Sequence, residues 1–130
     1  MTKTLPRIAI VGAGAWGTCL ANLAARNGLP VQIWSRRGSE SLATVLAEAD
    51  ILISAVAIAG VRGTIAQLQQ LEIPPHLTIV TATKGLDPET TQTPYRLWKQ
   101  GFPQQRSRSL SGQNLSKEIN QGLPAATVIA

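Results

Sequence analysis

The stretch Arg7-Ile8-Ala9-Ile10-Val11-Gly12-Ala13-Gly14-Ala15-Trp16-Gly17 decides the fold of this chain. The run that ends at Val11 is short, apolar and rich in β-branched side chains, which predicts a buried strand. Residues 15–27 are rich in Ala and Leu and contain no proline, and Asn27-Gly28 is typical of the end of a helix. The stretch therefore predicts a strand, a glycine-rich turn and a helix in direct succession.

Strands and helices alternate in the sequence that follows. Apolar residues recur at helical spacing between Leu42 and Ala49, with Ser39 or Ser41 as the candidate N-cap. The other expected elements are strands at 31–34, 51–57 and 77–82 and a helix at 61–68. This alternation predicts an open, doubly wound and mostly parallel α/β sheet of the Rossmann type.

The pattern is weaker after Lys84. The expected elements are a helix that starts at Asp87-Pro88 and is interrupted by Pro94, a polar edge strand at 106–111, a short helix at 114–121 and a strand at 126–130. The last of these runs to the final residue with no helix after it. We therefore expect residues 1–130 to form one domain that is incomplete at its C-terminus.

Length and composition restrict the class of protein. The chain has 130 residues, of which 44% are hydrophobic, so one domain with a substantial core is expected. No apolar run reaches the roughly 20 residues of a membrane span, and Met1–Thr4 leads into a strand pattern rather than a signal peptide. The single Cys excludes an internal disulfide and a Cys-rich zinc site. These features indicate a cytoplasmic protein without a membrane span.

The net charge of +5 does not by itself indicate a nucleic-acid partner. The 12 basic residues are scattered and only 4% of residues are aromatic, whereas proteins that follow a phosphate backbone concentrate charge and stacking side chains. We expect no nucleic-acid partner and attribute the charge to small phosphorylated ligands. No metal site is expected, because His76 is the only His and Cys19, a candidate core thiol, has no ligand partner near it in sequence.

Gly12, Gly14 and Gly17 form a G-x-G-x-x-G string after a strand and at the start of a helix, which is the context that dinucleotide binding requires. The first glycine allows a tight turn, the second lets the backbone approach a pyrophosphate, and the third lets helix and strand pack closely. The helix N-terminus at Ala15 then offers unpaired N–H groups to the phosphates. Trp16 is the one aromatic residue expected beside the cofactor. The alternative is a plain strand–helix turn.

Cofactor preference depends on the end of the second expected strand. Proteins that bind NAD usually have Asp or Glu there, about 20 residues after the glycines, whereas this chain has Trp34-Ser35-Arg36-Arg37. Two guanidinium groups can hold a 2′-phosphate, so they predict NADP as the preferred cofactor. Contacts worth roughly 3 kcal/mol together correspond to about a hundredfold preference. The alternative is that Arg36 and Arg37 are solvated loop residues.

Four strings of the sequence carry a family resemblance. They are Gly12-Ala13-Gly14-Ala15-Trp16-Gly17-Thr18, Ala82-Thr83-Lys84-Gly85-Leu86, Leu110-Ser111-Gly112-Gln113-Asn114-Leu115-Ser116-Lys117-Glu118 and Gly122-Leu123-Pro124-Ala125-Ala126. Together they resemble the N-terminal, cofactor-binding part of bacterial-type NAD(P)-dependent glycerol-3-phosphate dehydrogenases, over nearly the whole chain. The resemblance implies a Rossmann domain followed by a helical C-terminal domain beyond this chain.

The resemblance also implies roles for individual residues. Those implied to contact NADPH are Trp16, Arg36, Arg37, Lys84 and Ser116, and those implied to contact the substrate are Lys84, Gly112 and Asn114. Lys84 has a physical argument as well, because it follows an expected strand and open α/β sheets bind ligands at the carboxyl ends of their strands. An ammonium group there can polarise a ketone oxygen or hold a phosphate. From pattern alone, the alternative is a surface lysine before a glycine turn.

The chain departs from the family in three places. The connection after Arg37 is short, so one strand of the usual sheet is expected to be absent. Gln113 replaces the usual proline of the Ser-Gly-Pro string, which removes a rigid φ from the loop that carries the substrate residues. The family's general acid–base lysine lies beyond Ala130. We therefore expect no catalytic proton donor in these 130 residues, with Lys84 only assisting.

The resemblance implies an oxidoreductase that uses NADPH to reduce dihydroxyacetone phosphate reversibly to sn-glycerol 3-phosphate for glycerophospholipid synthesis, with this chain as its cofactor-binding half. A homodimer is a candidate assembly of the full-length enzyme. We expect the isolated chain to bind NADPH and to turn over little or no substrate. Two alternatives stay open: a non-catalytic NADP-binding module or remnant, and another NADP-dependent dehydrogenase with a related Rossmann half.

Overall fold

Six strands form one sheet in the computed structural model, which describes residues 5–12, 14–35, 41–112 and 127–129. The strands are β1 (Ile8–Val11), β2 (Val31–Trp34), β3 (Ile51–Ser54), β4 (Thr78–Thr81), β5 (Arg106–Gly112) and β6 (Thr127–Ile129). The helices are α1 (Ala15–Arg26), α2 (Leu42–Leu46), α3 (Val61–Gln69), α4 (Pro94–Gly101) and the short 3₁₀ helix η1 (Ile58–Gly60). The described ranges contain no helix long and apolar enough to cross a membrane.

The strand order across the sheet is β2-β1-β3-β4-β5-β6. β1 to β5 are parallel to their neighbours, whereas β6 runs antiparallel to the end of β5. After β2 the chain crosses to the other side of β1 and continues with β3. This reversal places a topological switch point at the carboxyl end of β1, where open α/β sheets bind their ligands. The predicted doubly wound, mostly parallel sheet is confirmed.

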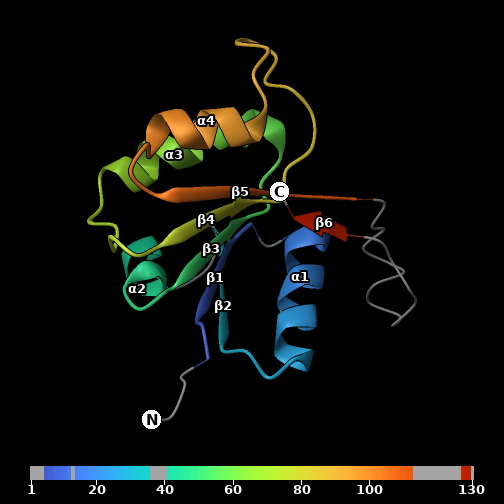
Figure 1. Ribbon diagram of the computed structural model, residues 1–130, viewed down its shortest axis with the longest axis vertical. Coiled ribbons are helices and arrows are strands. Elements are labelled where there is room, and N and C mark those ends of the chain that lie inside the picture. The colour runs from blue at the N-terminus through green and yellow to red at the C-terminus, as the bar shows by residue number, and fades with distance from the viewer. Residues whose placement is uncertain (1–4, 13, 36–40, 113–126, 130) are drawn as a thin grey trace.

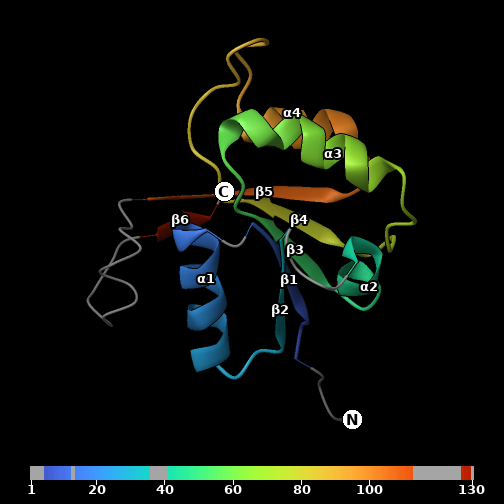
Figure 2. The same ribbon diagram turned by 180° about the vertical axis from the view of Figure 1, so that it is seen from behind.

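Helices cover both faces of the sheet (Figures 1 and 2). α1 packs on one face, against Ile8 and Ile10 of β1. α2, α3 and α4 pack on the other face, over a larger apolar cluster that includes Val11 and Trp98. All four residues of β1 are buried, since this strand has a neighbour on each side and helices on each face. The continuous apolar run before the glycines is the sequence signature of that position.

Capping residues fix the starts of two helices. Ser41 caps α2, with its Oγ accepting from the Thr44 N–H at 3.1 Å, as predicted. Thr93 caps α4, with its Oγ1 accepting from the Arg96 N–H at 3.3 Å. Pro94 occupies the first turn of α4, so the prediction that it interrupts a helix is wrong. A proline there lacks only an N–H that has no partner within the helix.

The prediction of a helix start at Asp87-Pro88 is also wrong, because this segment forms a turn. The Asp87 carboxylate accepts hydrogen bonds from the N–H and hydroxyl of Thr90, at 2.9 and 2.8 Å. Such local bonds from an Asp side chain offer the backbone an alternative to a helix.

The strand expected at 51–57 ends at Ser54, since its neighbour β1 turns away at Gly12, one residue beyond the Val11–Ser54 pair.

The strand expected at 106–111 is present as β5, but it does not lie at the edge of the sheet. β4 pairs with its first four residues and β6 pairs with its last three. Ser107 is buried opposite Ile79, on the face that α3 and α4 cover. Ser107 is therefore a small polar side chain under helices, whereas Arg106 and Arg108 of the same strand are exposed.

Candidate functional site

The fold has no room for a side chain at Gly12 and Gly17. Gly12 has a φ of +112°, and a Cβ there would lie 2.9 Å from the carbonyl carbon and oxygen of Ala55. A Cβ on Gly17 would collide with the carbonyl oxygen of Gly12. A Cβ on Gly14, by contrast, would meet no atom of the described residues within 4 Å. The first and third glycines thus allow close packing, and the second borders open space.

The first turn of α1 borders the same space. Gly14 is its N-cap, no described side chain caps the helix, and the first turn holds no acidic residue. Backbone N–H groups at the start of a helix lack partners within the helix and carry the positive end of its dipole. A pyrophosphate fits both the donors and the open approach over Gly14. This cradle is the feature of the chain that fits a dinucleotide.

A cavity of about 620 Å³ lies at the carboxyl ends of β1, β3 and β4. Three segments line it: Gly14–Trp16 at the start of α1, residues 55–58 after β3, and residues 82–84 after β4. Each segment directly follows a parallel strand, except that a glycine turn precedes the first. The cavity therefore occupies the place that the switch point predicts for a ligand.

A second cavity, of about 360 Å³, lies on the β2 side of the glycine turn. It is lined by Gly12, Trp34 and Ser35 and by Thr64 and Gln67 of α3. Both cavities share Gly14 and the segment 55–57. An elongated ligand with its middle at the start of α1 can therefore extend one end into each cavity.

Trp16 joins the glycine turn to the end of β4. Its indole Nε1–H donates to the carbonyl oxygen of Ala82 at 2.8 Å, and its ring is half-buried at the wall of the cavity. Lys84 lies two residues after Ala82 and is exposed where it lines the cavity. The position predicted for Lys84, just after the carboxyl end of its strand, is confirmed. The indole and the ammonium group thus border one space.

The other predicted site residues fall into two groups. Ala15 lies in the first turn of α1 and lines the larger cavity, and Gly112 is the last residue of β5, at the same edge of the sheet. Arg36, Arg37, Asn114 and Ser116 lie outside the described residues, as does Gln113. For all of them the predicted contacts with cofactor or substrate stay predictions.

Sequence reasoning missed the residues that hold the far wall of the cavity. The Thr83 hydroxyl donates to the Val56 carbonyl oxygen at 2.5 Å, and Arg62 of α3 contacts Asp87. Hydrogen bonds from the Thr90 hydroxyl, and then from its N–H and from Arg62, hold the pKa of Asp87 below its ordinary value although burial opposes the shift. The only sequence signal was the Asp-Pro pair, which is equally typical of a helix start and of a turn.

Cys19 belongs to the core and not to the cavity. It is a fully buried free thiol in α1, and burial raises its pKa above the ordinary value, against the opposing charge of Arg26. The prediction of a core thiol is confirmed. Within the described ranges, no three His, Cys, Asp or Glu side chains gather closely enough to hold a metal ion.

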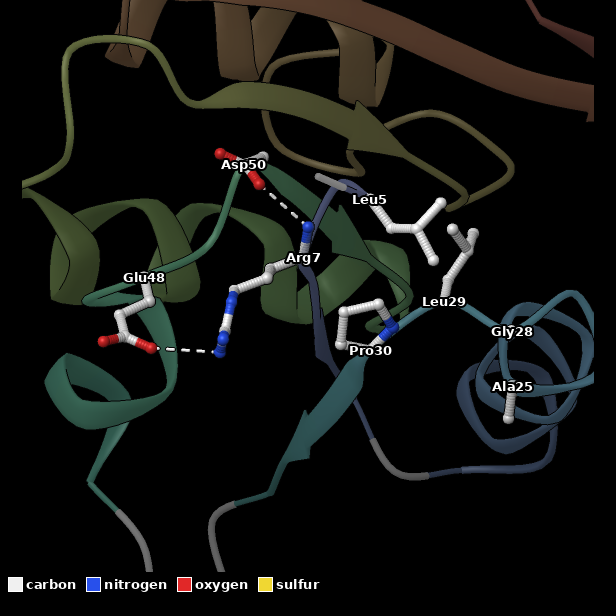
Figure 3. Close-up of a pocket in the computed structure, with 8 residues that line it drawn as sticks. All are labelled: Leu5, Arg7, Ala25, Gly28, Leu29, Pro30, Glu48 and Asp50. Carbon is white, nitrogen blue, oxygen red and sulfur yellow. Dashed lines mark hydrogen bonds and ion pairs between the residues drawn. The ribbon is translucent and has the colours of Figure 1, made fainter. Parts of the chain in front are cut away.

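A third cavity, of about 850 Å³, lies at the opposite, amino edge of the sheet (Figure 3). Its lining includes Leu5, Arg7, Leu29 and Pro30, together with Glu48 and Asp50. The Arg7 guanidinium lies 3.0 Å from Glu48, and the Arg7 backbone N–H donates to Asp50 at 2.8 Å. The polar groups of this cavity thus bind each other.

Comparison with known proteins places the chain among dehydrogenases. A family model described as the N-terminus of NAD-dependent glycerol-3-phosphate dehydrogenase matches residues 7–41 and 38–130. A glycerol-3-phosphate dehydrogenase [NAD(P)+] of Nostoc sp. is 57% identical over 123 residues, which cover 95% of this chain and 40% of that protein. One from Synechocystis sp. is 50% identical over 127 residues, covering 98% and 40%. The chain thus spans about 40% of the length of these relatives.

Solved structures share the fold. The crystal structure of glycerol-3-phosphate dehydrogenase from Coxiella burnetii superposes with a TM-score of 0.87 at 24% identity, over 96% of this chain and 46% of that one. The enzyme from Saccharomyces cerevisiae gives a TM-score of 0.84 at 16% identity, over 98% and 47%. At these sequence identities the superpositions show a shared fold and nothing more.

Proposed function

We propose that this chain, which belongs to the NAD-dependent glycerol-3-phosphate dehydrogenase family, forms the cofactor-binding half of a glycerol-3-phosphate dehydrogenase. The reaction is the reversible, NADPH-dependent reduction of dihydroxyacetone phosphate to sn-glycerol 3-phosphate, a precursor of glycerophospholipids. The observation that carries the proposal is the glycine cradle at the start of α1, which lies between two cavities at the switch point of the sheet.

The two cavities suggest how a dinucleotide lies. Its pyrophosphate fits the N–H groups of the first turn of α1, next to Gly14 and Ala15. The smaller cavity takes the adenosine half, because Ser35 lines it and the chain continues from there into Arg36-Arg37. The larger cavity takes the nicotinamide half, beside Trp16. This orientation brings the reactive end of the cofactor next to Lys84.

Lys84 has the chemistry that a ketone substrate requires. A bound reduced nicotinamide supplies the hydride for the ketone carbon. The Lys84 ammonium group stabilises the negative charge that develops on the ketone oxygen, or holds the substrate phosphate, at the mouth of the larger cavity. Gly112 and Asn114 are the proposed substrate contacts from the segment at the end of β5, and Ser116 faces the cofactor. We assign the proton for the alkoxide to a group other than Lys84.

The preference for NADP over NAD rests on Arg36 and Arg37. Gly12 N–H donates to the Trp34 carbonyl oxygen at 3.1 Å, so β2 ends beside the glycine turn and the two arginines follow at once. Guanidinium groups near the adenosine ribose pair with a 2′-phosphate, whereas a carboxylate there would repel it.

Two measurements on the purified chain test the proposal. NADPH titration followed by fluorescence is expected to show saturable binding, tighter than that of NADH. Oxidation of NADPH in the presence of dihydroxyacetone phosphate is expected to be close to the background rate, because none of the assigned site residues donates the proton. Absence of NADPH binding would refute the proposal. Steady turnover that depends on Lys84 would instead show that these residues form a complete catalytic site.

A further inference from the structure

The segment that carries Lys84 is fixed on its N-terminal side by two bonds. The carbonyl oxygen of Ala82 accepts from the Trp16 indole at 2.8 Å, which joins it to the first turn of α1. The Thr83 hydroxyl donates to the Val56 carbonyl oxygen at 2.5 Å, which joins it to the segment after β3. The chain is therefore tied to both neighbouring walls of the cavity up to the residue before Lys84.

On its C-terminal side the chain leaves the sheet. Gly85 has a φ of +102°, and the Leu86 side chain is 57% exposed. The next anchored residue is Asp87, whose side chain is only 2% exposed. Its backbone N–H donates to Gln92 O at 2.9 Å, and its carbonyl oxygen accepts from the Thr91 N–H at 2.8 Å. Residues 87–92 thus close on themselves around the Asp87 carboxylate.

Arg62 ties this closed loop to the rest of the molecule. It lies in the first turn of α3, and its Nε lies 3.2 Å from the Asp87 carboxylate. Its Nη2 also lies 2.8 Å from Glu89 Oε2. The same stretch of chain, from Val56 through η1 to α3, therefore holds the Lys84 segment on one side through Val56 and on the other through Arg62.

We infer that Arg62 is a positioning residue for Lys84: through Asp87 it fixes the loop that follows Lys84 and so keeps the ammonium group at the mouth of the larger cavity. This inference rests on the proposed function, since it concerns the ligand that Lys84 meets there. Arg62 itself does not line that cavity. Its effect on a ligand therefore passes through the loop.

A purely structural role for Arg62 predicts a different result. The pair between Arg62 and Glu89 is exposed, at 44% and 73%, and contributes little to stability. The Asp87 carboxylate is only 2% exposed, so loss of its Arg62 partner carries a cost, although both hydrogen bonds from Thr90 remain. The chain should thus stay folded with a lower urea midpoint, while the loop loses its link to α3. The loss of stability should be the same with and without Lys84, whereas the loss of ligand affinity should require Lys84.

The test compares Arg62→Met with matched controls in NADPH titrations. Arg62→Met is expected to weaken NADPH binding about threefold to fivefold, within the range of one lost charge-assisted contact. Arg62→Lys, which keeps a cation near Asp87, should restore most of the affinity. Glu89→Gln removes the exposed partner but keeps the Asp87 pair, and Arg7→Met removes an exposed arginine at the opposite edge. Both controls should bind like the wild type.

A double-mutant cycle with Lys84→Ala identifies the route of the effect. Lys84→Ala alone should weaken NADPH binding by about fivefold or more. Adding Arg62→Met to Lys84→Ala should then change nothing further, because the group that Arg62 positions is already gone. Asp87→Asn, the reciprocal variant, should reproduce the same pattern.

The outcomes separate the two claims. Loss of affinity in Arg62→Met that disappears in the Lys84→Ala background supports the positioning role. Equal loss in both backgrounds, or no loss at all, overturns that role and leaves the proposed cofactor site intact. A wild-type chain that does not bind NADPH overturns the proposed function, and the positioning role falls with it.

Discussion

The two edges of the sheet hold cavities of comparable size and opposite chemistry. The amino-edge cavity, of about 850 Å³, is larger than the carboxyl-edge cavity of about 620 Å³. At the amino edge, polar groups bind each other: the Arg7 guanidinium pairs with Glu48, and the Asp50 carboxylate accepts from the Arg7 backbone N–H and lies 3.1 Å from His76 Nε2. At the carboxyl edge, a glycine turn and a helix N-terminus present backbone donors to open space.

The direction of α1 favours the smaller of the two cavities for the proposed phosphate ligand. The helix begins at the carboxyl edge and ends at the amino edge, where Ala25 and Gly28 line the other cavity. Its dipole therefore favours an anion at the first cavity and disfavours one at the second. The polarity of a parallel sheet, and not the volume of a hollow, selects the ligand site.

Gly17→Ala is expected to have the largest effect. In a helix, Ala is normally more stable than Gly by up to about 1 kcal/mol. Here the added Cβ collides with the carbonyl oxygen of Gly12, so α1 must move away from the turn. We expect the free energy of unfolding to fall by about 2–3 kcal/mol, as in an overpacked core, and NADPH binding to become unmeasurable.

Gly63→Ala is the matched control, measured by urea unfolding and NADPH titration. Gly63 also lies inside a helix, α3, but a Cβ there meets no described atom within 4 Å. This variant should be as stable as the wild type or slightly more stable, with unchanged affinity. A Gly17→Ala chain with wild-type stability would contradict the close contact between α1 and the turn.

Arg36→Asp should change the cofactor preference within the carboxyl edge. Loss of the pairing with the 2′-phosphate, together with repulsion by the new carboxylate, should reduce the NADPH-to-NADH affinity ratio by about a hundredfold. Arg96→Asp, which changes an exposed arginine on α4, makes the same change in net charge far from the turn. It should keep the ratio. An unchanged ratio in Arg36→Asp would assign the preference to another group.

The central part of the fold follows from local patterns, because each element there is covered on a known face. The continuous apolar run before Gly12 predicts β1, and the helical spacing from Leu42 predicts α2 with Ser41 as its cap. The parallel, doubly wound sheet follows from the alternation of strands and helices, whereas the order of its strands comes from the structure. The position of Lys84 at a carboxyl end follows in turn, since it comes directly after a predicted strand.

Gly14→Ala and Gly28→Ala make the same substitution at the two edges. Gly14 has room for a Cβ in the fold, so Gly14→Ala should remain stable, but the methyl group should weaken NADPH binding by about tenfold because it blocks the backbone approach. Gly28 has a φ of +76°, so Gly28→Ala should lose about 1 kcal/mol of stability and bind NADPH normally. Weaker binding in Gly28→Ala would indicate a ligand at the amino edge.

The walls of the site could not be predicted from sequence in the same way. Asp87-Pro88 begins a helix in some proteins and a turn in others, and the choice here is made by the Thr90 bonds and by Arg62, which lies 25 residues away. The sequence pattern predicts a break at Pro94, although the cap from Thr93 makes it a helix start. Both errors concern residues whose partners are set by side-chain contacts and not by periodicity.

The smallest expected effect is the acid titration of Asp87. Bonds from Thr90 and then from Arg62 keep the pKa of this carboxyl below its ordinary value. Since the folded pKa is lowered, ionised Asp87 stabilises the loop at pH values above the ordinary pKa of about 4, and this contribution is lost as the pH falls through the folded value. Carbon-13 NMR should show Asp87 protonating at lower pH than an ordinary Asp.

The Thr90 amide resonance should titrate with the same midpoint, because its N–H donates to that carboxylate. Arg62→Met should move both midpoints upward by less than the full shift, since the Thr90 hydroxyl is the main cause and remains in place. If Asp87 titrates at its ordinary pKa, the carboxylate is not held by these bonds. The loop after Lys84 would then be no better anchored than the exposed pair between Arg7 and Glu48 at the opposite edge.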